Sequence, residues 1–155
     1  MVMPVQSKII SSSNDFDDWF SLNDTIMGGS SKAVCKASSK GLSLEGVVVE
    51  EKGGFVSCKS PIFSPLLNFS NYQGFELKIE GNGRTLKFGV SCKYGIFGIR
   101  EFFLDNSPGG LRWVTEIETK RFGTTLIKVP FESLEPTVLA KKISLPIKFK
   151  SNSIS

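Results

Sequence analysis

The sequence predicts an all-β protein whose antiparallel strands form a sandwich of the jelly-roll type. Three observations favour this fold class. Most segments alternate apolar and polar residues, which is the period of a strand with one buried face. Gly, Asn, Ser and Pro separate these segments, as expected of turns. Helical spacing is nearly absent, so we expect at most one short helical turn near the N-terminus, capped by Asn14.

The expected strands follow one another along the chain. Residues 42–51 form the first, and a Gly-Gly turn leads from it into the segment 52–60. Residues 74–81 place Phe75, Leu77 and Ile79 on one face, and the next strand continues this phase with Leu86, Phe88 and Val90. Since Asn-Gly favours two-residue hairpin turns, we expect Asn82-Gly83 to join these two strands as a β-hairpin. The remaining strands are expected at residues 100–105, 112–119, 125–131 and 143–149.

Length and composition indicate one soluble globular domain. The chain has 155 residues, of which 40% are hydrophobic and 22% charged. We expect residues 1–13 to be an extension and residues 14–155 to form a single domain. No apolar run approaches the roughly 20 residues that span a bilayer. The first residues resemble neither a signal peptide nor, because they lack arginine, a typical transit peptide.

The residue inventory excludes several kinds of site. The chain has no histidine, so it cannot itself supply a Ser-His-Asp triad, a Cys-His pair or a His-based zinc centre. Its three cysteines, Cys35, Cys58 and Cys92, are widely spaced and odd in number. This pattern favours reduced intracellular thiols over a disulfide framework or a zinc site.

The net charge of +4 raises the alternative of an RNA-binding module. All 15 acidic residues lie at or before Glu135, where they balance the basic ones. The excess charge therefore sits in the tail, on Lys141, Lys142, Lys148 and Lys150. Four lysines fall well short of a dedicated basic face, so solvated lysines beside a strand are the favoured interpretation. An RNA-binding surface would also use Arg84, Arg112 and Arg121.

The polar stretch "NDTIMGGSS", Asn23–Ser31, is the main candidate for chemistry. It lacks the GxxxxGK[ST] spacing of a phosphate loop. Asn23, Asp24 and the carbonyl groups of Gly28 and Gly29 would offer oxygen ligands to Ca²⁺, but no DxDxDG pattern is present. Catalysis would have to use the acids Asp24, Glu50 or Glu51, with Arg84 as the electrophile.

The structural interpretation of the same stretch is more specific. Asn23 and Asp24 are expected to hydrogen-bond their own turn, with positive φ at Gly28 and Gly29. Met27 would pack inward. Gly53, Gly54 and Phe55 would form a tight turn that places the aromatic ring in the core.

Four motifs together resemble one family. After Trp19 come "NDTIMGGSS", "LEGVVVEEKGGFVSCKS", "FSNYQGFELKIEGNGRTLKF" and "IKVPFESLEPT". Their order and spacing are similar to the pattern of the complex I intermediate-associated protein 30 family: W, NDxxMGGxS, GGFxS, Y-x-G, a GDGR-type hairpin and a PF segment. The resemblance covers roughly residues 19–137, and the order of four motifs makes it more specific than any single motif.

The resemblance implies a galactose-binding-domain-like jelly roll with a non-catalytic role and no cofactor or metal. It implies an assembly factor for a membrane redox complex, respiratory complex I or a photosystem. The implied partners are protein subunits or assembly intermediates of that complex. We expect a bacterial or photosynthetic-type member that is cytoplasmic, with peripheral association at the cytoplasmic face of the inner or thylakoid membrane.

The sequence departs from the family in three places. Asn82 replaces the acid of the GDGR-type hairpin, and Thr125 and Leu126 stand where the family commonly has a tryptophan. Family members also continue beyond the point where this chain ends. We therefore expect the last strands to be missing and a sheet edge to be unpaired, which would invite strand addition by a client.

The candidate binding residues are those of the family motifs. They are Asn23, Asp24, Met27, Gly28, Gly29, Ser30, Gly53, Gly54, Phe55, Gly81, Asn82, Gly83 and Arg84. A carbohydrate-binding module is the alternative from another class. It would need exposed aromatic rings, and Tyr72, Tyr94 and Trp113 are the residues that would supply them.

Overall fold

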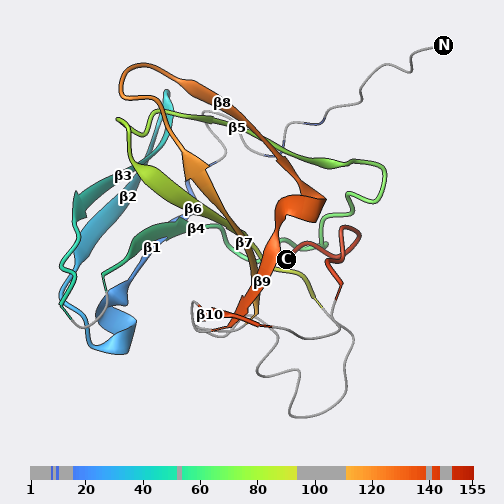
Figure 1. The fold of residues 1–155 in the computed structure, drawn as a ribbon, viewed down its shortest axis with the longest axis horizontal. Helices are drawn as coiled ribbons and strands as arrows, with labels where there is room; N and C mark the ends of the chain where they lie inside the picture. The colour runs from blue at the N-terminus through green and yellow to red at the C-terminus, as the bar shows by residue number, and fades with distance from the viewer. Residues whose placement is uncertain are drawn as a thin grey trace. The chain divides into compact units, whose positions relative to one another are not determined.

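The computed structural model describes residues 8, 10, 16–51, 54–93, 111–138, 141–143 and 148–155, without the side chains of Ile26, Met27 and Lys141. These residues belong to two compact units, Met1–Ile62 and Phe63–Ser155, and each is described by itself. All the paired strands named below are antiparallel, which confirms the all-β antiparallel fold class (Figure 1). Among the described residues no helix is long and apolar enough to cross a membrane.

The first unit contains two strand pairs. Strand β1 (Phe20–Asn23) pairs with β4 (Val56–Lys59), and β2 (Lys32–Ser38) pairs with β3 (Gly41–Val47). A 3-10 turn, η1 (Asp24–Met27), follows β1 directly. This turn is not the one expected in the stretch 14–22, whose last residues belong to strand β1 instead. Asn14, the expected cap, lies outside the described residues.

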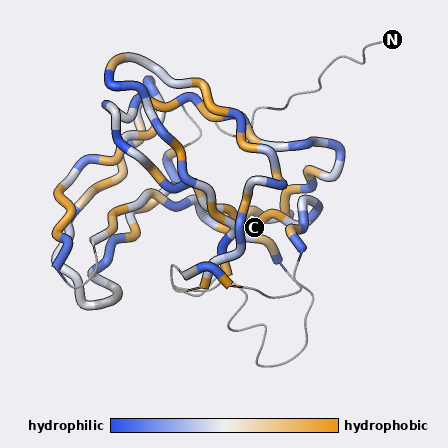
Figure 2. The backbone as a smooth tube through the Cα atoms, viewed as in Figure 1, coloured by the Kyte–Doolittle hydropathy of each residue, from blue (hydrophilic) through white to orange (hydrophobic). Residues whose placement is uncertain are grey.

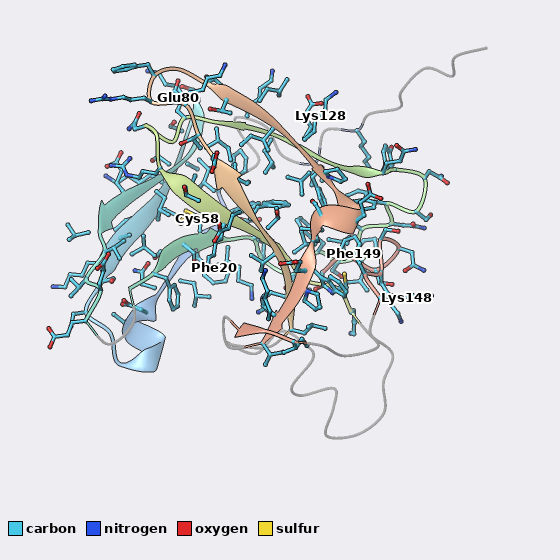
Figure 3. All side chains as sticks on the ribbon, in the orientation of Figure 1. Phe20, Cys58, Glu80, Lys128, Lys148 and Phe149 are labelled. Carbon is cyan, nitrogen blue, oxygen red and sulfur yellow. A yellow bond between two sulfur atoms is a disulfide. The ribbon has the colours of Figure 1, made fainter. Side chains whose placement is uncertain are left out.

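A disulfide joins the two strand pairs of the first unit. Cys35 of β2 is bonded to Cys58 of β4, with 5.7 Å between their Cα atoms, and Figure 3 shows the bond beside the label of Cys58. That separation is ordinary for disulfides. The prediction of reduced thiols is therefore wrong for these two residues. Their spacing of 23 residues gave no signal, because only strand pairing brings them together. Cys92 is free of a disulfide and buried.

The second unit contains two sheets. One pairs β5 (Gly74–Ile79) with β8 (Thr125–Pro130). The other has the order β10-β9-β7-β6, from Lys141–Lys142, Glu135–Val138, Arg112–Glu118 and Thr85–Val90. A second 3-10 turn, η2 (Phe131–Ser133), leads from β8 toward β9. The expected strand at 100–105 lies outside the described residues.

Both sheets contribute to one core in the second unit. Figure 2 shows apolar and polar residues alternating along β5. The rings of Phe75 on β5 and Phe88 on β6 meet edge to face, with centroids 5.3 Å apart. Around them lie the buried residues Phe69, Val90, Cys92, Leu111, Trp113, Val129, Leu134 and Ile154. The alternation predicted for residues 75–79 and 86–90 is thereby confirmed.

The predicted hairpin at Asn82-Gly83 is wrong, although the turn is real. Both residues have positive φ, at 53° and 79°, and Arg84 N donates to the Gly81 carbonyl oxygen at 3.0 Å. However, β5 pairs with β8 and β6 pairs with β7. The turn therefore carries the chain from one sheet to the other.

The last residues of the chain pair within the second unit. Ile154 bridges Leu67 on one side and Cys92 on the other, and it is only 3% exposed. The expected strand 143–149 is described only at its ends. There, Ile143 and Phe149 are half-buried against the core, whereas residues 144–147 lie outside the described part. The expectation of missing strands with an open edge stays a prediction, as does the single domain 14–155.

Candidate functional site: the Asp24 loop

Strand register places Asp24 where the two strand pairs of the first unit end. Asn23 is the last residue of β1 and lies opposite Val56, so Asp24 and Phe55 face each other as the next pair. Asp24 N donates to the Phe55 carbonyl oxygen at 3.1 Å. The Asp24 side chain is 0% exposed, so a charged group lies inside the protein.

Hydrogen-bond donors surround the Asp24 carboxylate. Oδ1 accepts from Ser31 N at 2.9 Å. Oδ2 accepts from the Ser31 hydroxyl at 2.6 Å, from Gly54 N at 2.8 Å and from Phe55 N at 3.3 Å. A buried carboxylate is stable only when its oxygens are satisfied in this way. These bonds join the start of β2 and the turn before β4 to the end of β1.

The same contacts keep Asp24 ionised. The hydrogen bond from the Ser31 side chain lowers the pKa of Asp24 below its usual value, and backbone N–H groups of Gly54, Ser31 and Phe55 act in the same direction. Burial opposes them but is outweighed. Asp24 is therefore an anion at neutral pH, but it is neither accessible to a substrate nor poised to take up a proton.

The two glycines of the loop have different reasons to be glycine. Gly28 ends η1 with φ +83°, as expected. Positive φ was also expected at Gly29, but Gly29 is not among the residues with positive φ. Its role is close approach instead, because a Cβ there would lie 2.4 Å from Asp24 Cγ.

Sequence reasoning missed Ser31, which is the main partner of Asp24. Ser31 is 0% exposed, and its Oγ also accepts from Val49 N at 2.8 Å. The neighbouring candidate, Ser30, is exposed instead. Strand alternation could have predicted that Ser31 is buried, because Ser31 directly precedes β2 and lies two residues before the buried Ala33.

The expectation that Asn23 and Asp24 bond their own turn is only partly correct. Asp24 does reach Ser31 at the end of its loop, but its other bonds go to residues about thirty positions away. Asn23 Nδ2 donates to the Ala33 carbonyl oxygen at 3.0 Å and gives η1 no side-chain cap. Of the other candidates, Phe55 is half-buried and Gly54 has φ +102°. Gly53 and the side chain of Met27 lie outside the part of the chain that the structure describes.

The geometry gives no support to Ca²⁺ binding or catalysis at this loop. The Asp24 oxygens face N–H and O–H groups, which would repel a cation. Glu50 and Glu51 are exposed on the following loop, whereas Asp24 is inaccessible.

The hydrogen bonds of Asp24 hold two loops together, and the exposed side chains of these loops form a surface. We call it the Asp24 loop surface: Thr25, Ser30, Val48, Glu50 and Glu51.

The remaining candidates, Gly81 to Arg84, lie in the second unit. Gly81 is buried, and a Cβ there would lie 2.2 Å from Thr119 Oγ1. Thr119 Oγ1 donates to the Arg84 carbonyl oxygen at 2.7 Å, and Gly83 N donates to the Lys120 carbonyl oxygen at 2.8 Å. The turn is thus fastened to the connection between β7 and β8, with the Arg84 side chain exposed.

Sequence reasoning also missed a shallow groove of about 340 Å³ on the outward face of the larger sheet. Its lining combines Lys87 and Lys142 with Glu116 and Glu135, and Lys142 Nζ lies 2.7 Å from Glu135 Oε2. Opposite charges neutralise one another there, so the groove favours neither an anion nor a cation. No signal short of strand register could have brought these residues together.

The carbohydrate-binding alternative loses support from the placement of the aromatic residues. Trp113 is only 5% exposed and belongs to the core. Tyr72 is half-buried against the same core, and Tyr94 lies outside the described residues. A sugar would need flat exposed rings on which to stack, which neither described residue supplies.

Comparison with known proteins identifies the family. No curated protein and no solved structure matches the chain. The model of the family complex I intermediate-associated protein 30 matches residues 9–155. This family is a galactose-binding-like β-sandwich associated with complex I assembly, and its assembly factors are not known enzymes. As its motifs predicted, the chain belongs to the complex I intermediate-associated protein 30 family.

Proposed function

We propose that this protein is a non-enzymatic assembly factor that binds an intermediate of a membrane redox complex of the complex I or photosystem type. One observation carries the proposal beyond family membership. The only carboxylate in the NDTIMGGSS motif is buried and held by four hydrogen bonds. A motif built this way fixes the shape of a loop pair, which suits a binding surface better than a reaction.

The Asp24 loop surface is the contact that we assign to the assembly intermediate. Val48 is 46% exposed and offers an apolar contact, flanked by the exposed acids Glu50 and Glu51. Exposed apolar side chains with a charged rim are typical of protein interfaces. The acids would favour a basic patch on the intermediate.

We also propose the cytoplasmic location that the sequence favours. The Cys35–Cys58 disulfide opposes this part of the proposal, because such bonds persist mainly in oxidising compartments. The redox state of these two cysteines inside the cell therefore tests the location: free thiols would support it, and a disulfide would contradict it.

The test is affinity capture with the full tagged chain from detergent-solubilised membranes of the cell that produces it. Captured subunits are quantified by mass spectrometry for the wild type and for the Glu50→Lys/Glu51→Lys variant. We expect the wild type to retain subunits of a respiratory or photosynthetic complex. Reversal of both charges should lower their recovery about tenfold, because like charges then meet at the interface.

The matched control reverses two exposed acids of the second unit, Glu76→Lys/Glu132→Lys. It changes the net charge equally and should leave recovery unchanged. Wild-type capture without any subunit of such a complex would refute the proposed function. Equal loss in both double variants would refute the assignment to the Asp24 loop surface.

A further inference from the structure

Two connections of the second unit meet at the same end of its sheets. One is the Gly81–Arg84 turn between β5 and β6; the other, residues 119–124, joins β7 to β8 (Figure 1). Besides the bonds from Thr119 and Gly83 described above, Lys120 N donates to Thr125 Oγ1 at 2.8 Å. Thr124 Oγ1 lies 3.5 Å from Glu80 Oε1, and Figure 3 labels Glu80 at this end.

This fastened end displays an apolar side chain at its apex. Phe122 is 81% exposed, the highest value among the large hydrophobic residues that the structure describes. Gly123 follows with φ +77°, and the space around its missing Cβ is open. Leu126, 54% exposed, lies four residues further along, on the outward face of β8. Phe122 on the fastened turn and Leu126 at the start of β8 contribute to no core in the described residues, so both side chains are available for an external contact.

Cations flank these two apolar residues. Arg84, Lys120 and Arg121 are exposed, and within the described part of the chain none of the three is within ion-pair distance of an acid. The Arg121 guanidinium lies over the Phe122 ring, with 5.7 Å from Cζ to the centroid. We call this set the cationic tip: Arg84, Lys120, Arg121, Phe122 and Leu126. The acids nearest in sequence, Glu80 and Glu118, are fewer than its cations.

We propose that the cationic tip docks the protein peripherally on an anionic lipid surface. Phe122 and Leu126 would enter the interface between headgroups and acyl chains, while the cations meet the phosphates. Apolar insertion and charge attraction are each weak alone, but together they give reversible peripheral attachment. The occupant is a membrane rather than single-stranded RNA, because RNA platforms stack several bases on aromatic rings. Here one ring is accompanied by an aliphatic leucine, which a lipid interface accepts equally well.

The inference rests on the second unit alone and does not depend on the proposed function. It is tested by co-sedimentation of the full chain with vesicles of phosphatidylcholine, with or without about 30% phosphatidylglycerol. We expect binding to the anionic vesicles only. Phe122→Ser should weaken it about tenfold, by the transfer free energy of one aromatic side chain. Arg84→Gln/Arg121→Gln should weaken it about thirtyfold, by the attraction of two cations near the surface.

Matched controls separate the tip from general effects. Phe20→Ser removes the same residue type from another exposed position, and Lys36→Gln/Lys40→Gln removes two exposed charges from the β2–β3 hairpin. Both controls should bind like the wild type. Phe122→Trp should keep binding, and its added fluorescence should be quenched by brominated acyl chains.

The opposite results overturn the inference. The inference is wrong if the wild-type protein stays in solution with anionic vesicles. It is also wrong if neither Phe122→Ser nor Arg84→Gln/Arg121→Gln changes the binding. Binding of single-stranded oligouridine that is lost in the tip variants, without vesicle binding, would assign the tip to RNA instead. Because the vesicles contain no protein, none of these results depends on the capture experiment.

Discussion

At the scale of single residues, Asp24 shows how the charged residue of a family motif can serve structure rather than chemistry. Its carboxylate accepts hydrogen bonds from Ser31 and from the adjacent Gly54 and Phe55, so one charge holds two distant segments to the end of β1. Removing such a charge leaves several buried donors without an acceptor, which costs more than the bonds themselves contribute. Gly29 belongs to the same arrangement, because any side chain there would occupy the place of the carboxylate.

The first prediction is that Asp24→Asn destabilises the first unit in a pH-dependent way. An amide cannot accept from all four donors, so we expect the melting temperature at about pH 7 to fall by on the order of 10 °C. The folded-state pKa of Asp24 is lowered, so its contribution is fully present above the unfolded value of 3.8. That contribution is lost as the pH falls through the folded value. The two proteins should therefore converge in stability in acid.

Thermal unfolding followed by circular dichroism between about pH 7 and pH 2 measures this difference. Glu45→Gln, at an exposed position of β3, is the control and should follow the wild type throughout. A constant gap between Asp24→Asn and the wild type at every pH would show that the charge of Asp24 is not what matters.

At the scale of elements, local patterns predicted where several strands lie, but long-range pairing determined which strands are neighbours. Alternation identified the strands near 74–79, 85–90, 112–118 and 125–130 because each buries one face. β1, β2 and β9 were missed; β1 and β9 have only four residues each, too short for a clear period. The Asn82-Gly83 turn has hairpin chemistry, yet register with β7 and β8 assigned its flanking strands to different sheets.

The second prediction concerns the bond between β2 and β4. Cys35→Ala/Cys58→Ala should lower the free energy of unfolding by about 3 kcal/mol, because the disulfide restricts a loop of 23 residues in the unfolded chain. Urea unfolding with and without reductant measures it, and only the wild type should respond to reductant. Peptide mapping without reduction should recover the Cys35–Cys58 pair. Recovery of both peptides as free thiols from protein trapped inside cells would contradict it and would support a reducing compartment.

At the scale of the whole molecule, the sequence predicted the class and the family better than the site. Alternation and the order of four motifs were sufficient for an all-β member of this family. The chemistry of the motif could not be read in advance, because the partners of Asp24 lie up to 31 positions away. The cationic tip was equally hidden, since Arg84 and Arg121 become neighbours only when β5 and β7 end together.

The third prediction concerns when the whole molecule is bound. An assembly factor must leave once its contact surface is covered by the next subunit, so its complex should be smaller than the finished one. In native gel electrophoresis of mildly solubilised membranes, the tagged chain should migrate with a subcomplex and be absent from the mature complex. Pulse labelling should show labelled subunits passing through the tagged band before they reach the mature band.

Glu50→Lys/Glu51→Lys should deplete the tagged band, whereas the control Glu76→Lys/Glu132→Lys should not. A released factor binds through a surface that the finished complex later occupies, so it cannot remain on that complex. Stable migration of the tagged chain with the mature complex would therefore identify it as a permanent subunit instead.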